Sequence, residues 1–306
     1  MKKVVADVVL ADAAHDDGST RVEDHGGITS SAKDKEIRMV KYMQNYSYVP
    51  PTNSTDAMHT TKIECGSAPN YTEFFGLSSK FRSANNEDKW IYEHFFKDTK
   101  AAAIKGTFVE IGGFNGMDES NSRFFENCLG WEGLLVEGQP DNYEKLRNNR
   151  PLSHKMSFAP SCDAEYERVN KTVQFAIYPF LNSGLKGHAK TYDAKSHVDV
   201  PCGPFTPVLE DIFEFTNKRI NFFSLDVEGS EYRVLQTIDF SKVFIDVMMI
   251  EIQNNYCPRD KCEVREQVRE KMTSEGYRRY EGLVPKSDIY VHPKSPFQLS
   301  SSYKAA

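Results

Sequence analysis

The chain has 306 residues, 39% of them apolar and 27% charged, and this balance excludes a disordered chain, a collagen-like fibre and a disulfide miniprotein. Its 38 basic and 44 acidic residues leave a net charge of −6, which argues against nucleic acid as a partner. No apolar run approaches the ~20 residues that span a bilayer, so we expect a soluble protein without a membrane span.

The N-terminus and the cysteines bear on the compartment. Residues 1–14 resemble a signal peptide only weakly, because Asp7 and Asp12 interrupt their apolar run. The six cysteines are scattered through a chain too long to need them as staples, so we expect free thiols. Cys257 and Cys262 are close enough to bond in an oxidising compartment. We therefore favour the cytoplasm, with a secretory lumen as the alternative.

The first part of the chain has little apolar periodicity. We expect residues 1–84 to form a flexible leader and then a helical and loop cap, rich in aromatic residues, that binds the acceptor. Ile37, Val40 and Met43 recur at helical spacing and predict a short helix between Lys35 and Tyr48 that carries them on one face. A second helix is predicted after Asn86.

From Thr107 onward, strand and helix patterns alternate, which is typical of a mostly parallel, doubly wound sheet covered on both faces. Short apolar runs predict strands at Thr107–Ile111, Gly133–Val136, 173–177, Asn221–Leu225 and Val247–Ile252. Helices are predicted at Asp118–Leu129, Pro140–Leu146, Glu231–Ile238 and 264–272, and an antiparallel pair at Arg278–Tyr280 and Ile289–His292. We expect one domain at residues 85–293 and a flexible tail at residues 294–306.

A glycine-rich turn follows the first strand of this domain. Gly112, Gly113 and Gly116 lie where glycine lets the backbone turn tightly and approach a ligand closely. The second strand is followed by Glu137, 25 positions after Gly112, where a carboxylate can accept both ribose hydroxyls of an adenosine. The two features, in this order, indicate an adenosine-containing cofactor.

Two details favour S-adenosylmethionine over NAD as that cofactor. In a dinucleotide fingerprint, a third spaced glycine lets a helix pack close beneath the pyrophosphate. The turn in this chain lacks that third glycine. Glu110 lies inside the first strand, where its charge suits the cationic amino end of a methionine and repels a pyrophosphate. An ordinary strand-end carboxylate that caps a neighbouring loop is the alternative for Glu110.

Three ordered blocks resemble the FkbM-type class I methyltransferases, in particular their eukaryotic-like branch. The first block is Phe108–Pro151, FVEIGGFNGMDESNSRFFENCLGWEGLLVEGQPDNYEKLRNNRP; the second is Phe223–Tyr232, with Asp-x-Glu-Gly-x-Glu; the third is Met249–Glu251. Together the resemblance covers roughly Lys89 to Pro293. It implies an α/β, Rossmann-like fold with a mostly parallel, seven-stranded sheet that ends in an antiparallel pair. The N-terminal helical and loop extension precedes this domain in the chain.

The resemblance also implies where the cofactor binds. The methionine end would be held by the glycine turn and the residues after it, the ribose by the acid after the second strand, and the adenine by the segment after the third strand. These positions are Glu110, Gly112, Gly113, Asn115, Gly116, Ser120 and Asn121 for the methionine end, Glu137 for the ribose, and Cys162 and Asp163 for the adenine. Asn115 stands where the family has Asp, and Ser122 where it has Thr, which we expect to preserve cofactor binding.

Three carboxylates follow the fourth and fifth strands of the family pattern. Asp226 is placed to face the cofactor or the acceptor, Glu228 is the candidate general base, and Glu251 is a second proton acceptor or a ligand of substrate hydroxyls. His188 is an alternative base. A divalent metal held by these three carboxylates is compatible with the spacing, which does not require one. For Glu231 we expect a structural role at the start of its helix.

The sequence therefore predicts an S-adenosylmethionine-dependent O-methyltransferase acting on a small hydroxylated acceptor such as a carbohydrate, as the resemblance implies. Two alternatives remain: a cofactor-binding scaffold that has lost turnover, and, less favoured, an NAD-dependent oxidoreductase.

Overall fold

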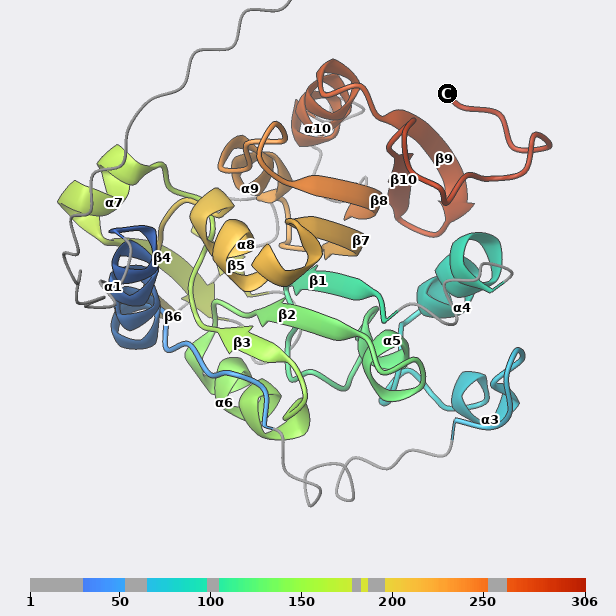
Figure 1. Ribbon diagram of the computed structural model, residues 1–306, viewed down its shortest axis with the longest axis horizontal. Coiled ribbons are helices and arrows are strands. Elements are labelled where there is room, and N and C mark those ends of the chain that lie inside the picture. The colour runs from blue at the N-terminus through green and yellow to red at the C-terminus, as the bar shows by residue number, and fades with distance from the viewer. Residues whose placement is uncertain (1–29, 53–64, 98–104, 178–182, 187–195, 253–262) are drawn as a thin grey trace, which may run out of the picture.

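A computed structural model describes residues 30–52, 65–97, 105–177, 183–186, 196–252 and 263–306 (Figure 1). Its centre is a seven-stranded sheet in the order β3-β2-β1-β7-β8-β10-β9. Neighbours from β3 to β8 run parallel, whereas β10 is antiparallel to both β8 and β9. This order and direction confirm the predicted Rossmann-like fold with a C-terminal antiparallel pair.

The strands of the main sheet are β1 (Thr107–Ile111), β2 (Glu132–Val136), β3 (His154–Met156), β7 (Arg219–Leu225), β8 (Phe244–Glu251), β9 (Arg278–Val284) and β10 (Ser287–Val291). A second sheet contains β4 (Thr172–Ile177), β5 (Gly184–Leu185) and β6 (Ser196–Pro201). The described helices are α1 (Ser30–Asn45), α3 (Thr72–Phe75), α4 (Glu87–Ile91), η1 (Tyr92–Phe96), α5 (Arg123–Asn127), α6 (Pro140–Asn149), α7 (Ala164–Asn170), α8 (Thr206–Ile212), η4 (Glu214–Thr216), α9 (Glu231–Gln236) and α10 (Glu263–Ser274).

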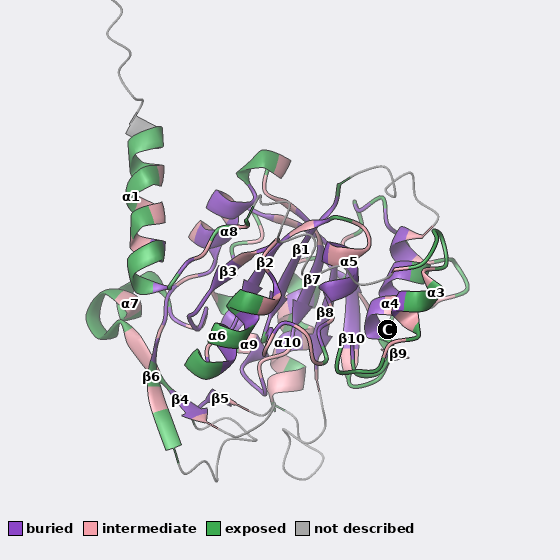
Figure 2. Cartoon of the chain, turned by 90° about the horizontal axis from the view of Figure 1, so that it is seen from below, coloured by how far each residue is buried: buried purple, intermediate pink, exposed green. Residues whose placement is uncertain are grey.

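The sheet buries both of its faces. Successive side chains of a strand point to opposite faces, so Phe108 packs with the aromatic residues of α4, η1 and α5, whereas Val109 packs with α8, α9 and α10. All five residues of β1 are buried, as expected for a central parallel strand (Figure 2).

Helix α1 forms at the predicted place but turns the opposite face inward. Ile37 is 60% exposed and Met43 is 57% exposed, whereas Tyr42 and Tyr46 are buried; Figure 2 shows exposed residues along α1. Tyr42 Oη donates to Asp211 and the Tyr46 ring stacks on Phe158. Burial of the tyrosine face is favoured over burial of the face with Ile37 and Met43, because each tyrosine buries a large ring and also has a hydrogen-bond partner for its hydroxyl group.

The predicted cap is continuous with the core of the domain. Tyr42, Tyr46 and Tyr48 belong to the cluster on one face of the main sheet, and Phe74 belongs to the cluster on the other face. The end of the chain is packed in the same way, because Phe297 contacts Phe96.

The structure corrects the predicted helix at Asp118–Leu129, because α5 begins only at Arg123. Residues 118–122 instead form a loop whose Ser120 and Ser122 hydroxyl groups donate to the buried Glu110. A buried carboxylate needs such donors, and this need outweighs the helical propensity of the segment. The strand predicted at residues 173–177 exists as β4, but it pairs with β5 and β6 rather than with the main sheet.

The expectation of free thiols is wrong for four of the six cysteines. Cys65 bonds to Cys128 and Cys162 bonds to Cys202, with Cα atoms 5.6 Å apart in both pairs. Partners 63 and 40 positions apart leave no local sequence signal, since only the folded chain brings them together. Cys257 and Cys262 lie outside the described residues.

None of the helices in the described ranges is long and apolar enough to cross a membrane.

Candidate active site

A cavity of about 310 Å³ opens at the carboxyl ends of β1, β2, β7 and β8. Doubly wound sheets bind ligands at this edge. One half of the cavity is lined by the turn after β1 and the end of β2; the other half is lined by the ends of β7 and β8 and by the β9–β10 turn.

The glycine turn brings the backbone close to the neighbouring loop. Gly112 has φ +85°, and a Cβ atom there would lie 1.8 Å from the carbonyl oxygen of Asp226. The N–H groups of Gly112 and Gly113 both donate to Val136 O, at 3.0 and 3.1 Å. Only glycine at position 112 allows this close approach of the turn after β1 to the loop after β7.

Glu137 lies beside this turn, on the wall formed by the end of β2. Its carboxylate accepts the N–H of Phe114 at 2.8 Å and that of Gln139 at 2.7 Å. Burial raises the pKa of Glu137 to about 7, and the backbone donors oppose this rise. The side chain is therefore held in place by the main chain of both strand ends, and it lines the cavity.

Glu110 is held from the other side by the loop before α5. It accepts the Asn121 N–H at 2.6 Å and the hydroxyl groups of Ser120 at 2.8 Å and Ser122 at 2.6 Å. Glu110, Ser120 and Asn121 all line the cavity. This loop-capping arrangement is the alternative that the sequence left open for Glu110, and it coexists with a place on the cavity wall.

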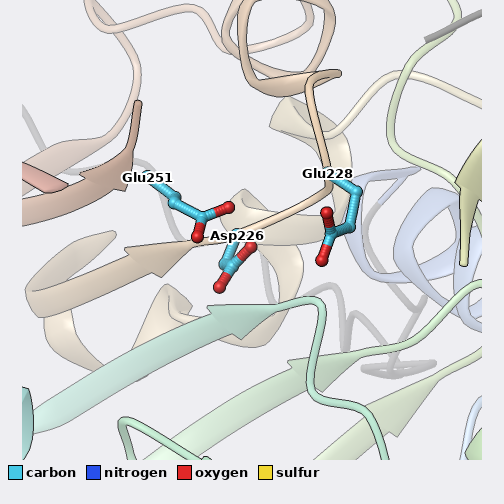
Figure 3. Close-up of side chains that lie close together, drawn as sticks. All are labelled: Asp226, Glu228 and Glu251. Carbon is cyan, nitrogen blue, oxygen red and sulfur yellow. The ribbon is translucent and has the colours of Figure 1, made fainter. Parts of the chain in front are cut away.

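Asp226, Glu228 and Glu251 come together at the opposite half of the cavity (Figure 3). One carboxylate oxygen from each of the three lies within 4.8 Å of the others. Burial, and next the neighbouring Glu251 carboxylate, raise the pKa of Asp226 well above its usual range. A side-chain hydrogen bond with Glu251 contributes to this rise in the pKa of Asp226.

Glu231 supports the same loop from behind. Its Oε1 atom accepts the N–H groups of Val227 and Gly229, both at 3.1 Å, and burial raises its pKa to about 8. The side chain thus holds the loop that carries Glu228, whose φ of +57° needs such support.

Residues 110–279, more than half of the chain, match the model of the family described as Methyltransferase FkbM domain. The chain belongs to the FkbM methyltransferase family. A search of curated proteins finds no match.

Solved structures resemble this FkbM methyltransferase at low identity. Fibrillarin of Aeropyrum pernix, solved with natively bound S-adenosylmethionine, is 8% identical over 61% of this chain, with a TM-score of 0.34. The match spans 65% of the fibrillarin chain, less than two thirds of it. Fibrillarin in its complex with Nop5p is 9% identical over 61% of this chain and 72% of that chain, with a TM-score of 0.31. An S-adenosylmethionine-dependent methyltransferase from Aquifex aeolicus is 12% identical over 67% of this chain and 92% of that one, with a TM-score of 0.29.

Four residues predicted for cofactor binding lie off the cavity wall of this FkbM methyltransferase. Asn115 accepts the N–H groups of Met117 and Asp118 through its side chain, and Gly116 packs against Arg150. Cys162 is disulfide-bonded, and Asp163 caps α7 by accepting the N–H of Tyr166. Short polar residues satisfy backbone groups at helix starts and turns, and this local role takes precedence at Asn115 and Asp163.

In place of Cys162 and Asp163, residues 158–161 line the cavity. Ser161 Oγ is buried and has no hydrogen-bond partner among the described residues. The sequence offered no signal for Ser161, because the segment after β3 is irregular. His188, the alternative base, lies outside the described residues.

Arg150 is the main residue that sequence reasoning missed. Its side chain is fully buried, donates to Ser120 Oγ at 3.0 Å and Ser122 Oγ at 3.1 Å, and pairs with Glu126 at 3.1 Å. Its Nη1 atom also lies 3.8 Å from the Glu110 carboxylate. A buried arginine is costly without such partners, and they come from segments far apart in the chain. The only sequence feature that pointed to a role for Arg150 was its place just after a helix, near several acidic motifs.

Proposed function

We propose that this FkbM methyltransferase transfers a methyl group from S-adenosylmethionine to a hydroxyl group of a small acceptor. The observation that carries the proposal is the composition of one cavity: a glycine turn with a backbone-held acid on one side, and a cluster of carboxylates on the other. S-adenosylmethionine is the cofactor, in keeping with the family.

The cofactor half suits an adenosine. Each oxygen of the Glu137 carboxylate accepts one backbone N–H and keeps a second lone pair, which would accept a ribose hydroxyl. Gly112 and Gly113 leave room for the methionine end, whose amino group would lie beside Glu110. The unpartnered hydroxyl group of Ser161 would meet the adenine edge, the role first assigned to Cys162 and Asp163.

The acceptor half suits a hydroxyl group that must lose a proton. When bound, the cofactor supplies a methyl group on a sulfonium, and transfer forms a carbon–oxygen bond while the electrons of the broken carbon–sulfur bond stay on sulfur. The acceptor proton would pass to Glu228, whose carboxylate lines this half of the cavity. Asp226 and Glu251 would orient the hydroxyl group by accepting or donating hydrogen bonds.

Calorimetric titration of the purified chain tests the cofactor assignment. We expect micromolar binding of S-adenosylmethionine and S-adenosylhomocysteine and no heat from NAD. Glu137→Ala should weaken both adenosyl compounds roughly 10-fold or more, since one or two hydrogen bonds to a charged group are lost. Affinities unchanged in Glu137→Ala, or binding of NAD alone, would contradict the proposal. Acceptor hydroxyl compounds are then screened by radiolabelled methyl transfer.

The titration of Glu137 makes cofactor affinity depend on pH. Its carboxyl group holds a proton below the pKa of about 7, and that proton competes with the donating ribose hydroxyls. We expect the affinity for S-adenosylhomocysteine to rise about 10-fold from pH 6 to pH 8. Because the folded-state pKa lies above the ordinary value of 4.5, the unliganded chain should conversely lose stability as the pH rises between 4.5 and 7.

The matched control for this prediction is Glu137→Gln, measured over the same pH range. Its affinity should be lower than that of the unaltered chain at pH 8 and nearly constant from pH 6 to pH 8. A pH profile that persists in Glu137→Gln would assign the effect to another group.

The two disulfides favour an oxidising compartment over the cytoplasm. We infer that the protein acts in a secretory lumen or outside the cell, which suits a glycan as the acceptor.

A further inference from the structure

The walls of the cavity are unusually rich in acid. Eight carboxylates line it and Lys286 is the single lysine or arginine among its lining residues. Glu110 and Glu137 are held by backbone and hydroxyl donors on the cofactor half, whereas Asp226, Glu228 and Glu251 lie together on the acceptor half. Carboxylates crowded in this way need hydrogen bonds, a shared proton or a cation.

Asp226, Glu228 and Glu251 have the geometry of ligands for one ion. Asp226 directly follows β7, Glu228 lies in the loop after it, and Glu251 is the last residue of β8. Figure 3 shows the carboxylates of Asp226 and Glu251 close to each other, with Glu228 on the side of the loop. Oxygen ligands lie about 2.0–2.1 Å from Mg²⁺ and about 2.3–2.6 Å from Ca²⁺, so two of them on opposite sides of one ion are about 4 Å apart for Mg²⁺ and about 5 Å apart for Ca²⁺. The three carboxylate oxygens lie within 4.8 Å of one another, so they can surround one ion, and an ion as small as Mg²⁺ would draw them closer together.

A second observation comes from Ser230, two residues after Glu228. Its side chain is 2% exposed and lines the same cavity, yet its Oγ atom has no hydrogen-bond partner in the described part of the chain. A buried hydroxyl group without a partner costs roughly 1–3 kcal/mol, so its presence in the cavity wall, two positions along the chain from Glu228, points to a bound species that supplies the missing hydrogen bond. A hydrated cation brings water molecules that can fill this role.

We propose that Asp226, Glu228 and Glu251 form a binding site for one divalent cation of the hard class, such as Mg²⁺ or Mn²⁺. Three carboxylate oxygens and no nitrogen or sulfur ligand select this class over zinc or copper. Mg²⁺ binds few protein ligands and keeps several waters, which leaves positions for an acceptor oxygen. The cation holds the acceptor hydroxyl group and lowers its pKa, while the second oxygen of Glu228 takes the proton.

The role in methyl transfer rests on the proposed function, but the binding of the cation does not. A vicinal diol, as in a sugar, presents two oxygens to such an ion at once. The site therefore favours polyhydroxylated acceptors over isolated alcohols.

The test measures Mn²⁺ binding to the full chain by electron paramagnetic resonance, which detects the unbound ion, with Mg²⁺ as competitor. We expect about one site per chain, displaced by excess Mg²⁺. Asp226→Asn and Glu251→Gln, which preserve side-chain shape, should each weaken Mn²⁺ at least 10-fold, and so should Glu228→Gln. Circular dichroism and the thermal midpoint verify that each variant is folded.

The matched control is Glu119→Gln, which removes a charge from the same cavity outside the cluster. It should leave Mn²⁺ affinity within about 2-fold of the unaltered chain. Equal weakening by Glu119→Gln would reveal diffuse attraction to an acidic cavity and overturn the site, as would an absence of Mn²⁺ binding or indifference to the three cluster variants.

Titration with S-adenosylhomocysteine separates the two proposals. If it binds while Mn²⁺ does not, the metal site is wrong and the proposed function stands. If Mn²⁺ binds at the cluster while neither adenosyl compound binds, the metal site stands and the proposed function fails.

Discussion

Replacing Arg150 by Met is expected to lower the free energy of unfolding by about 3–5 kcal/mol. The methionine fills much of the volume but leaves the buried Glu126 carboxylate without its ion-pair partner and removes donors to Ser120 and Ser122. These two serines hold Glu110 on the cavity wall, so affinity for S-adenosylhomocysteine should fall as well. Urea denaturation followed by circular dichroism measures the first effect, and calorimetry measures the second.

Arg147→Met, in the last turn of the helix that ends just before Arg150, is the control. Arg147 is 43% exposed and makes one ion pair with Glu144, a type of contact that contributes at most ~0.5 kcal/mol. Arg150→Lys should recover part of the loss, because it keeps the charge but not the planar set of donors. A loss below about 1 kcal/mol in Arg150→Met would mean that the network does not stabilise the fold.

The second large effect is expected at the Cys162–Cys202 disulfide. Changing both cysteines to Ala should lower stability by about 2–4 kcal/mol, because the bond closes a loop with a sequence separation of 40 and restricts the unfolded chain. The bond lies in the small cluster with Phe175 and Leu185, and both of these side chains line the cavity. Its removal should therefore also weaken cofactor binding.

The single variants Cys162→Ala and Cys202→Ala supply the control for this prediction. Each alone breaks the bond, so each should lose nearly as much stability as the double variant. If the loss of stability in the double variant equalled the sum of the losses in the two single variants, the two residues would act independently. Treatment of the unaltered chain with a reductant should weaken cofactor binding in parallel.

Much of the main sheet could be predicted because its elements carry local patterns. A strand buried on both faces reads as a continuous apolar run, which is why β1, β2, β7 and β8 were found within a few residues of their ends. The three-residue β3 and the two-residue β5 are too short to show any pattern. The loop before α5 was predicted as helix, because its donors to Glu110 act between residues about ten positions apart.

The same distinction separates the parts of the site. Glu137, Gly112 and the acids Asp226, Glu228 and Glu251 lie where parallel strands end, and such positions meet at one edge of the sheet whatever the detailed packing. The adenine-side residues could not be placed in this way. The segment after β3 is irregular, so its path over the cavity depends on the disulfide and on the small second sheet.

The sequence by itself determined the buried strands β1, β2, β7 and β8, the glycine turn and the acids that follow the strands, since these depend on local periodicity and on the common edge of a parallel sheet. Only the tertiary structure decided which face of α1 is buried, which cysteines pair, and that Arg150 supports Glu110. Each of these depends on the free energy of contacts between residues far apart in the chain. Such contacts bury a ring or a charge or join two thiols, and they leave no pattern in the sequence around either partner.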